Sequence, residues 1–312
     1  MSLYDLVSLK KALKENLDNS QAVVAVEELR ARANSILTQV PVMTAKDRQQ
    51  VQDLVAYYTN TLKELNAPIV EIKKKIDFID NEIYHLTQKL FANNYELETR
   101  YGTVDFVRNS RRIHMGKDIE RLVEQKILMY TDWRYPSLEI GCRDGEWTKY
   151  MVAADPLYIV DRHEEFLDGA VGKFSPEYQR RLRKYHLKNN DLSALPVGQF
   201  GFIFSWGYFN YISMDTLKQY LRQMFALLKP GGVVFFSYND GDTTAGAGMA
   251  ENFAQTYVPR SLLIPLAESL GFEIINAPDI NSNTSWIEIK RPGKLSTVKA
   301  HQVLGEIKRT NL

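Results

Sequence analysis

The segment from Tyr135 to Thr148, YPSLEIGCRDGEWT, constrains the fold more than any other part of the chain. Its apolar residues up to Ile140 predict a buried strand, and Gly141 and Gly145 predict a tight turn. The residues after Gly145 continue at helical spacing. A strand that runs through a glycine turn into a helix presents free backbone N–H groups, as α/β proteins do where they bind nucleotides.

A second strand supports a nucleotide site. Residues 157–160, LYIV, are apolar and end in Asp161, which follows Gly141 by 20 residues. An acid at this separation can accept hydrogen bonds from both hydroxyls of a ribose, although Asp161 could also cap a following helix. The turn lacks the glycines of a dinucleotide fingerprint, because Arg143 and Glu146 stand in it instead. A nicotinamide-dependent oxidoreductase is therefore disfavoured.

The stretch E-I-G-C-R-D-G, with Glu139 ahead of the glycines, resembles the first motif of class I S-adenosylmethionine (SAM)-dependent methyltransferases. Later segments resemble the same family in order. They are Asn190-Asp191-Leu192 with Leu195-Pro196 (adenine loop), residues 201–214 (fourth strand and active-site loop), residues 227–239 (helix end, turn and fifth strand), and residues 269–275 with 284–291 (closing antiparallel pair). The match spans about residues 117–291. It implies a Rossmann-like α/β domain, with a mostly parallel seven-stranded sheet and an antiparallel final strand, that binds SAM.

The resemblance also implies a set of cofactor contacts. The implied residues are Glu139, Gly141, Cys142, Arg143, Asp144, Gly145, Asp161, Arg162, Asp191, Leu192, Ser205 and Trp206. The glycine turn would border the methionine part, Asp161 the ribose, and Asp191 and Leu192 the adenine. Ser205 and Trp206 would line the side facing the methyl group. Alternatively, Glu139 is a strand-end acid and Trp206 belongs to the core.

Two departures from the family pattern bear on activity. Arg143 replaces the middle glycine, so its Cβ restricts positive φ, and its guanidinium either crowds the cofactor or clamps the cofactor's carboxylate. The loop after the fourth strand has neither the histidine common in small-molecule methyltransferases nor the N/D-P-P-Y/F signature of amino-group methyltransferases. Methylation of DNA bases or of glutamine is therefore disfavoured, while methyl transfer to an O or N atom of small-molecule type stays open. The residues expected near a substrate are Tyr208, Asn210, Tyr211, Tyr238 and Asn239, and no catalytic residue is assigned. The glycine-rich stretch 241–250 is either a lid or an exposed loop.

Composition divides the chain near residue 100, because no glycine precedes that point. We predict a helical oligomerisation or docking module over 1–100, a connector and leading helix over 101–135, a methyltransferase domain over 136–292 and a polar tail over 293–312. Within the module, helices are expected to end at Asp18-Asn19-Ser20, at Pro41 and at Asn66-Ala67-Pro68.

The residues after Pro68 form a regular apolar seam. At alternating three- and four-residue spacing the chain carries Ile69, Ile72, Ile76, Ile79, Ile83, Leu86 and Leu90. Isoleucine at both core positions of a heptad favours three or more strands. We therefore predict a homo-oligomer, a trimer or higher, through these helices. The alternative is an antiparallel hairpin across Pro68 within one chain.

Charge and cysteine content bound the partners and location. The net charge is +1, so the basic runs at Arg108, Arg111, Arg112 and His114 and at 180–186 are interpreted as solvated helix faces rather than nucleic-acid contacts. The single cysteine excludes an intrachain disulfide and favours the cytoplasm. The five histidines lack metal-ligand spacing, and no apolar run is long enough to span a membrane. No metal and no membrane association are expected.

Two functions from different classes follow from these patterns. The first is a SAM-dependent methyltransferase on an oligomerising helical scaffold. The second is a structural component of a large assembly, such as a virus particle assembled in the cytoplasm, with a methyltransferase-like head that is weakly active or inactive.

Overall fold

The computed structural model describes residues 2–18, 21–39, 45–109, 116–279 and 284–295. The chain divides into two compact units, Met1–Lys89 and Leu90–Leu312, which we call the helical unit and the head. The division lies ahead of the predicted boundary at residue 100, so the end of the longest helix belongs to the head. Arg111, Arg112, His114 and the tail from residue 296 lie outside the described residues.

The helical unit contains α1 (Leu3–Asp18), α2 (Gln21–Gln39) and most of α3 (Ala45–Tyr101). Helix α3 runs without interruption through Pro68, so the predicted break there, and with it the hairpin across Pro68, is wrong. An interior proline costs about 3 kcal/mol because it removes one backbone hydrogen bond and crowds the preceding turn. Strong helix formers on both sides, and buried Leu62 and Ile76 flanking the proline, offset this cost.

The apolar seam of α3 is only partly covered within one chain. Ile76, Ile79 and Leu90 are buried, whereas Ile69, Ile72, Ile83 and Leu86 are half-buried. Inside the helical unit, Lys10 of α1 forms an ion pair with Asp80 of α3. The predicted oligomer through this seam stays a prediction.

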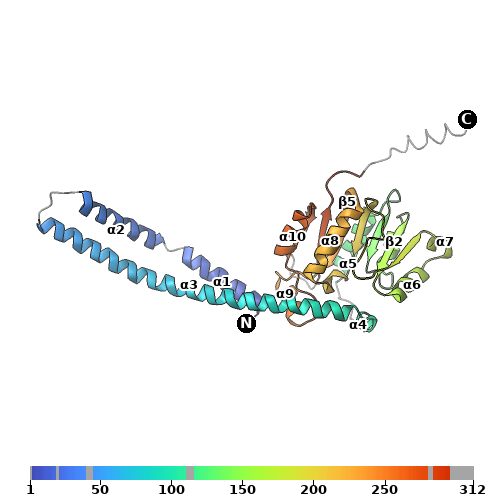
Figure 1. Cartoon of the computed structure of the whole chain (residues 1–312), viewed down its shortest axis with the longest axis horizontal. Helices are drawn as coiled ribbons and strands as arrows, with labels where there is room; N and C mark the ends of the chain where they lie inside the picture. Colours follow the sequence, from blue (N-terminus) through green and yellow to red (C-terminus); the bar gives the residue numbers. More distant parts are fainter. Residues whose placement is uncertain (1, 19–20, 40–44, 110–115, 280–283, 296–312) are drawn as a thin grey trace, which may run out of the picture. The chain divides into compact units, whose positions relative to one another are not determined.

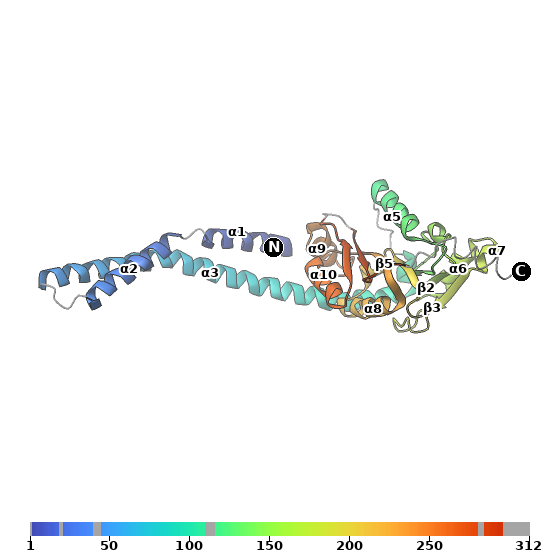
Figure 2. The ribbon, with the colours of Figure 1, turned by 90° about the horizontal axis from the view of Figure 1, so that it is seen from above.

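The head is built on one central sheet (Figures 1 and 2). It has seven strands in the order β3-β2-β1-β4-β5-β7-β6, and β7 alone runs antiparallel to its neighbours. The strands are β1 (Ser137–Ile140), β2 (Leu157–Asp161), β3 (Leu182–His186), β4 (Phe200–Ser205), β5 (Leu228–Tyr238), β6 (Glu273–Asn276) and β7 (Ser285–Lys290). This topology confirms the predicted fold class.

Helices cover both faces of the sheet, because side chains along each central strand alternate between two buried clusters. The elements between the strands are α4 (Val104–Asn109), α5 (Lys117–Tyr130), η1 (Thr148–Met151), α6 (Glu164–Gly172), α7 (Pro176–Gln179), η2 (Phe209–Tyr211), α8 (Met214–Leu227), α9 (Thr244–Glu251) and α10 (Arg260–Ser269). One cluster packs α5 and α6 on the sheet. The other packs α8 and α10, and it also contains Tyr101 and Val107.

The helix predicted after the glycine turn is wrong. Only a short 3-10 turn, η1, separates the turn from β2. Trp147, Met151 and Ala154 are all buried in one core cluster, and the packing of these side chains holds the segment in a short turn. The turn is therefore not backed by the positive end of a helix.

Two other segments differ from expectation. The glycine-rich stretch 241–250 is not an exposed loop, because residues 244–250 belong to α9, which is capped by Thr243. Gly246 allows α9 to pack closely on the backbone of Asp240, since a Cβ at this position would lie 1.9 Å from the carbonyl oxygen of Asp240. The basic run 180–186 forms the edge strand β3 instead of a helix face, and its exposed Arg183 and Lys184 suit an unpaired sheet edge.

We expect the substitution Pro68→Ala to raise the stability of the helical unit by about 1–3 kcal/mol, because alanine restores the missing amide donor. Thermal unfolding followed by circular dichroism at 222 nm measures the change. Lys63→Ala, an exposed change one turn earlier, is the control and should have little effect. A loss of stability in Pro68→Ala would show that the helices beside α3 require the proline.

Candidate functional site

The candidate site lies at the carboxyl ends of β1, β2 and β4, where the strand order reverses. Parallel pairing aligns Ile140 with Val160, and Glu139 with Phe204, so the residues that follow these strands meet at one edge. At this edge lie Gly141, directly after β1, and Asp161 and Ser205, the last residues of β2 and β4. Open α/β sheets bind ligands at such a reversal. We call the space beyond these three strand ends the crevice.

Glu139 points away from the crevice. Its side chain is 2% exposed and accepts a hydrogen bond from the Thr148 hydroxyl in η1. Burial raises the pKa of Glu139 to about 8. The hydrogen bond from Thr148 lowers this pKa, whereas the nearby carboxylates of Asp161 and Asp144 raise it further. In this arrangement Glu139 acts as a strand-end acid that holds η1 beside the turn.

The glycine turn adopts the backbone that the family pattern requires, including at its arginine. Gly141 and Gly145 have φ of 72° and 76°, and Arg143 has φ of 46°. A non-glycine residue in this region costs about 1–2 kcal/mol. The Arg143 guanidinium donates to the carbonyl oxygen of Val107 at 2.7 Å. Arg143 therefore bonds to α4, which neither predicted role included.

The remaining turn residues have structural contacts. Cys142 is buried, and burial raises the pKa of its thiol. Asp144 is exposed and lies 3.5 Å from Lys173. At Gly145 an added Cβ would lie 3.0 Å from Ala170 of α6, so glycine allows the turn to pack on that helix.

Asp161 lies at the expected place, but its carboxylate is bonded to its own chain. One oxygen accepts the backbone N–H of Arg143 at 2.9 Å, and the other accepts that of His163 at 3.0 Å. Asp161 is 3% exposed, and burial raises the pKa of its carboxyl against these two hydrogen bonds. Asp161 thus ties the glycine turn to the start of α6.

The adenine-loop residues are placed differently from one another. The exposed carboxylate of Asp191 accepts hydrogen bonds from Ser193, and these bonds lower its pKa. Leu192 is buried. Asn190, which was not among the predicted contacts, accepts hydrogen bonds from Arg162 and Tyr220. The loop therefore faces the other strand ends through Asn190 rather than through Asp191.

Ser205 and Trp206 contribute to the core. The Ser205 hydroxyl donates to the carbonyl oxygen of Ile140 at 2.8 Å and joins the ends of β4 and β1. Trp206 packs with Trp147 and Phe235 in the cluster under α5 and α6.

The five predicted substrate residues separate into two groups. All five are buried. Tyr208 rests on Gly141 and Tyr211 stacks on Tyr101 at the crevice, whereas the side chains of Asn210, Tyr238 and Asn239 have no exposed surface. Asn210 bonds to Gln255 and Ser237, and Asn239 donates to the carbonyl oxygens of Gly246 and Thr256. Among the described residues, neither the Tyr238 hydroxyl nor Oδ1 of Asn239 has a hydrogen-bond partner.

Aromatic side chains fill the crevice. A Cβ on Gly141 would lie 2.5 Å from Cδ2 of Tyr208, so the Tyr208 ring rests on the first glycine of the turn. The Tyr208 hydroxyl bonds to that of Tyr220 at 2.7 Å, and the Arg162 guanidinium lies over its ring.

The residue that completes the filling is Tyr101, at the end of α3. Its ring stacks on Tyr211 with centroids 4.6 Å apart and planes 7° from parallel, and it meets Tyr208 edge-on. Burial raises the pKa of Tyr101 well above its usual value, and nearby Asp161 raises it further. Sequence reasoning missed Tyr101 because it lies in the predicted connector, and its only signal was an aromatic side chain beside the first glycine of the chain, Gly102.

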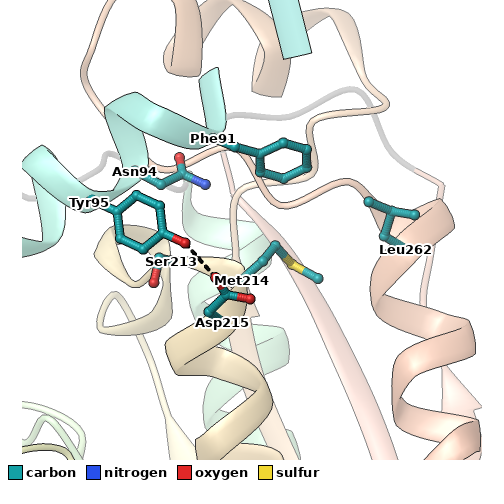
Figure 3. A pocket seen from close by; sticks show the side chains of 7 residues that line it. All are labelled: Phe91, Asn94, Tyr95, Ser213, Met214, Asp215 and Leu262. Carbon is teal, nitrogen blue, oxygen red and sulfur yellow. Dashed lines mark hydrogen bonds between the residues drawn. The ribbon is translucent and has the colours of Figure 1, made fainter. Parts of the chain in front are cut away.

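The end of α3 is firmly attached to the head. Asn94 is 1% exposed and bonds with both ends of its amide to the backbone of Tyr257. Tyr95 donates to the carboxylate of Asp215 beside a cavity of about 250 Å³ (Figure 3). This cavity contains none of the predicted cofactor residues.

The residues of the crevice therefore do not fit SAM in this conformation. Tyr208 covers Gly141, Tyr101 packs against Tyr208 and Tyr211, and the carboxylate of Asp161 is already hydrogen-bonded. Binding of SAM therefore requires that at least Tyr101 and Tyr208 move.

Comparison with known proteins gives one family match. Residues 138–234 match the family model described as a methyltransferase domain. No curated protein matches the chain.

Solved structures with a similar fold include a SAM-dependent methyltransferase from Mesorhizobium loti (13% identity, TM-score 0.47, covering 55% of this chain and 97% of that one). Another is the N-methyltransferase NodS from Bradyrhizobium japonicum in complex with S-adenosyl-l-homocysteine (14% identity, TM-score 0.45, covering 64% and 98%). The [4+2]-cyclase SpnF is a third (13% identity, TM-score 0.46, covering 68% and 94%).

The family match and the strand order define the head as a class I methyltransferase domain. The predicted assignment to this enzyme class, whose cofactor is SAM, is confirmed. The individual cofactor contacts stay predictions. Among the residues that the structure describes, no helix has the length and apolar character needed to cross a membrane.

The raised pKa of Glu139 predicts a pH-dependent stability of the head. Because the folded state binds the proton more tightly than the unfolded state, Glu139 makes the head less stable as pH rises from its ordinary pKa to about 8. The slope is at most about 1.4 kcal/mol per pH unit. In Glu139→Gln this contribution should disappear. All four tryptophans lie in the head, so urea unfolding followed by tryptophan fluorescence measures it selectively. Equal pH slopes in both proteins would contradict the prediction.

Proposed function

We propose that the head transfers the methyl group of SAM to an oxygen or nitrogen atom of a small-molecule type of substrate, in the cytoplasm or in a particle assembled there. The observation that carries this proposal is the edge where Gly141, Asp161 and Ser205 meet within the region that matches a methyltransferase domain. The turn has positive φ at Gly141, Arg143 and Gly145, the three positions at which the family pattern has glycine. Methyl transfer mainly requires positioning of the acceptor and exclusion of water, so the lack of an assigned base does not oppose it.

The proposal is tested by calorimetric titration of SAM into the full-length chain and into Asp161→Asn. We expect saturable binding that weakens by about tenfold or more in the variant, because an amide lacks the charge and one acceptor for the ribose hydroxyls. Asp168→Asn is the matched control, since Asp168 lies exposed on α6 and bonds to Lys184. Its affinity should equal that of the wild type. No binding at millimolar SAM, by the wild type or by Arg143→Gly, would contradict methyl transfer.

A second candidate function is favoured by the filled crevice. In this alternative the chain is a structural component of a large assembly, and the methyltransferase domain serves as a folded head that does not act on SAM. Aromatic residues that replace a cofactor would stabilise the head, because their stacking and burial make it independent of a ligand.

Both candidates include self-association through the helical unit. Four half-buried residues of the α3 seam support it, since they leave apolar surface for another copy. We expect light scattering of the full-length chain to give a trimer or a larger oligomer. A monomer at high protein concentration would contradict this part of the proposal.

A further inference from the structure

We propose that residues 98–108 form an intramolecular plug of the SAM crevice, and that SAM binds only after this plug has moved out. The inference rests on the proposed methyltransferase function. It assigns to the end of α3 and to α4 a control over cofactor access that the family match over residues 138–234 does not include.

The plug is bonded to the loop after each of the three strands that form the crevice. After β1, Arg143 donates to the carbonyl oxygen of Val107 at 2.7 Å. After β2, Arg162 pairs with Glu98 at 3.2 Å. After β4, the backbone N–H of Ser213 donates to the Glu98 carboxylate at 3.0 Å. One short segment therefore ties together all three parts of the site.

The plug also occupies the space that a ligand would need. Tyr101 and Val107 are 3% and 1% exposed and belong to the core cluster that includes Ile140 and Val160. The flat ring of Tyr101 stacks on Tyr211 and meets edge-on the ring of Tyr208, which itself rests on Gly141 of the glycine turn. A nucleoside and the Tyr101 ring cannot occupy this position together.

The attachments differ in strength along the segment, which indicates where it opens. Upstream, the buried Asn94 anchors α3 by two hydrogen bonds to Tyr257. Downstream, Arg108 pairs with Glu165 at 2.6 Å, but both side chains are about half exposed, and such pairs contribute little. Helix α3 ends at Tyr101, and Gly102 separates it from the short α4. Opening therefore requires that the last turn of α3, after the Asn94 anchor, moves or unwinds together with α4, so that both Tyr101 and Val107 leave the crevice.

Substitution of Arg143 tests this closed state most specifically. Its guanidinium is the bond between the glycine turn and α4, and its own φ of 46° is one that glycine adopts freely. Arg143→Gly therefore removes the bond without disturbing the turn, and it creates no cavity in the core. Tyr101→Ala is the complementary change, because it empties the space that the ring fills against Tyr208 and Tyr211.

The experiment compares SAM affinities of the full-length wild type, Arg143→Gly and Tyr101→Ala by calorimetry. A ligand that binds only the open state gains apparent affinity in proportion to the open fraction. We therefore expect both variants to bind SAM at least about tenfold more tightly than the wild type does. Adding Asp161→Asn to either variant should reverse most of this gain. Phe272→Ala is the control for general loosening, because Phe272 is a buried aromatic of the same cluster that packs on Phe225 away from the crevice. It should leave the affinity unchanged.

Hydrogen exchange of the wild-type chain provides a second readout that needs no variant. With SAM bound, amides of residues 98–108 should exchange faster, while those of α8 keep their protection. Unchanged or increased protection of residues 98–108 would overturn the plug.

The titrations separate the two proposals. If the wild type and both variants bind SAM with equal affinity, the plug is overturned and the methyltransferase function stands. If no protein binds SAM, although tryptophan fluorescence shows that Arg143→Gly is folded, the proposed function fails and the plug fails with it.

Discussion

The stacking of Tyr101 on Tyr211 is the contact on which the arrangement of the site depends. It holds the end of α3 against the carboxyl edge of the sheet, where Tyr208 already rests on Gly141. Removing these rings from water stabilises the head by several kcal/mol, since each large aromatic side chain that becomes fully buried contributes about 1.5–3 kcal/mol. The edge that gives a methyltransferase domain its ligand site is thereby used as part of the core.

This use of the edge explains the polar groups around it. Asp161 would be costly to bury without partners, and it finds them in the N–H groups of Arg143 and His163. Glu98 is matched by Arg162 and Ser213, and Asn94 by the backbone of Tyr257. These three groups, which a ligand could have satisfied, are satisfied by the protein itself. The same bonds that make the closed head stable also have to break before a cofactor can enter.

Much of the fold could be predicted from local patterns, because strands and helices with strong periodicity bury one face whatever their surroundings. The ordered segments around Gly141, Asp161 and residues 227–239 led to the correct sheet. Elements whose conformation depends on neighbours were predicted wrongly. Proline did not break α3, the turn after β1 did not continue as a helix, and residues 241–250 became α9 because Gly246 could approach Asp240. In each case packing energy outweighed a local preference.

By itself the sequence determined the class of the head and the positions of the glycine turn and of Asp161, because these depend on residue types at fixed short spacings along one βαβ unit. Only the tertiary structure decided what faces these residues. Tyr101 lies 40 residues before Gly141 in the chain, and no local pattern connects the two. Contacts between such distant segments depend on how α3 and α4 pack on the sheet, and that packing determines whether the crevice is open or filled.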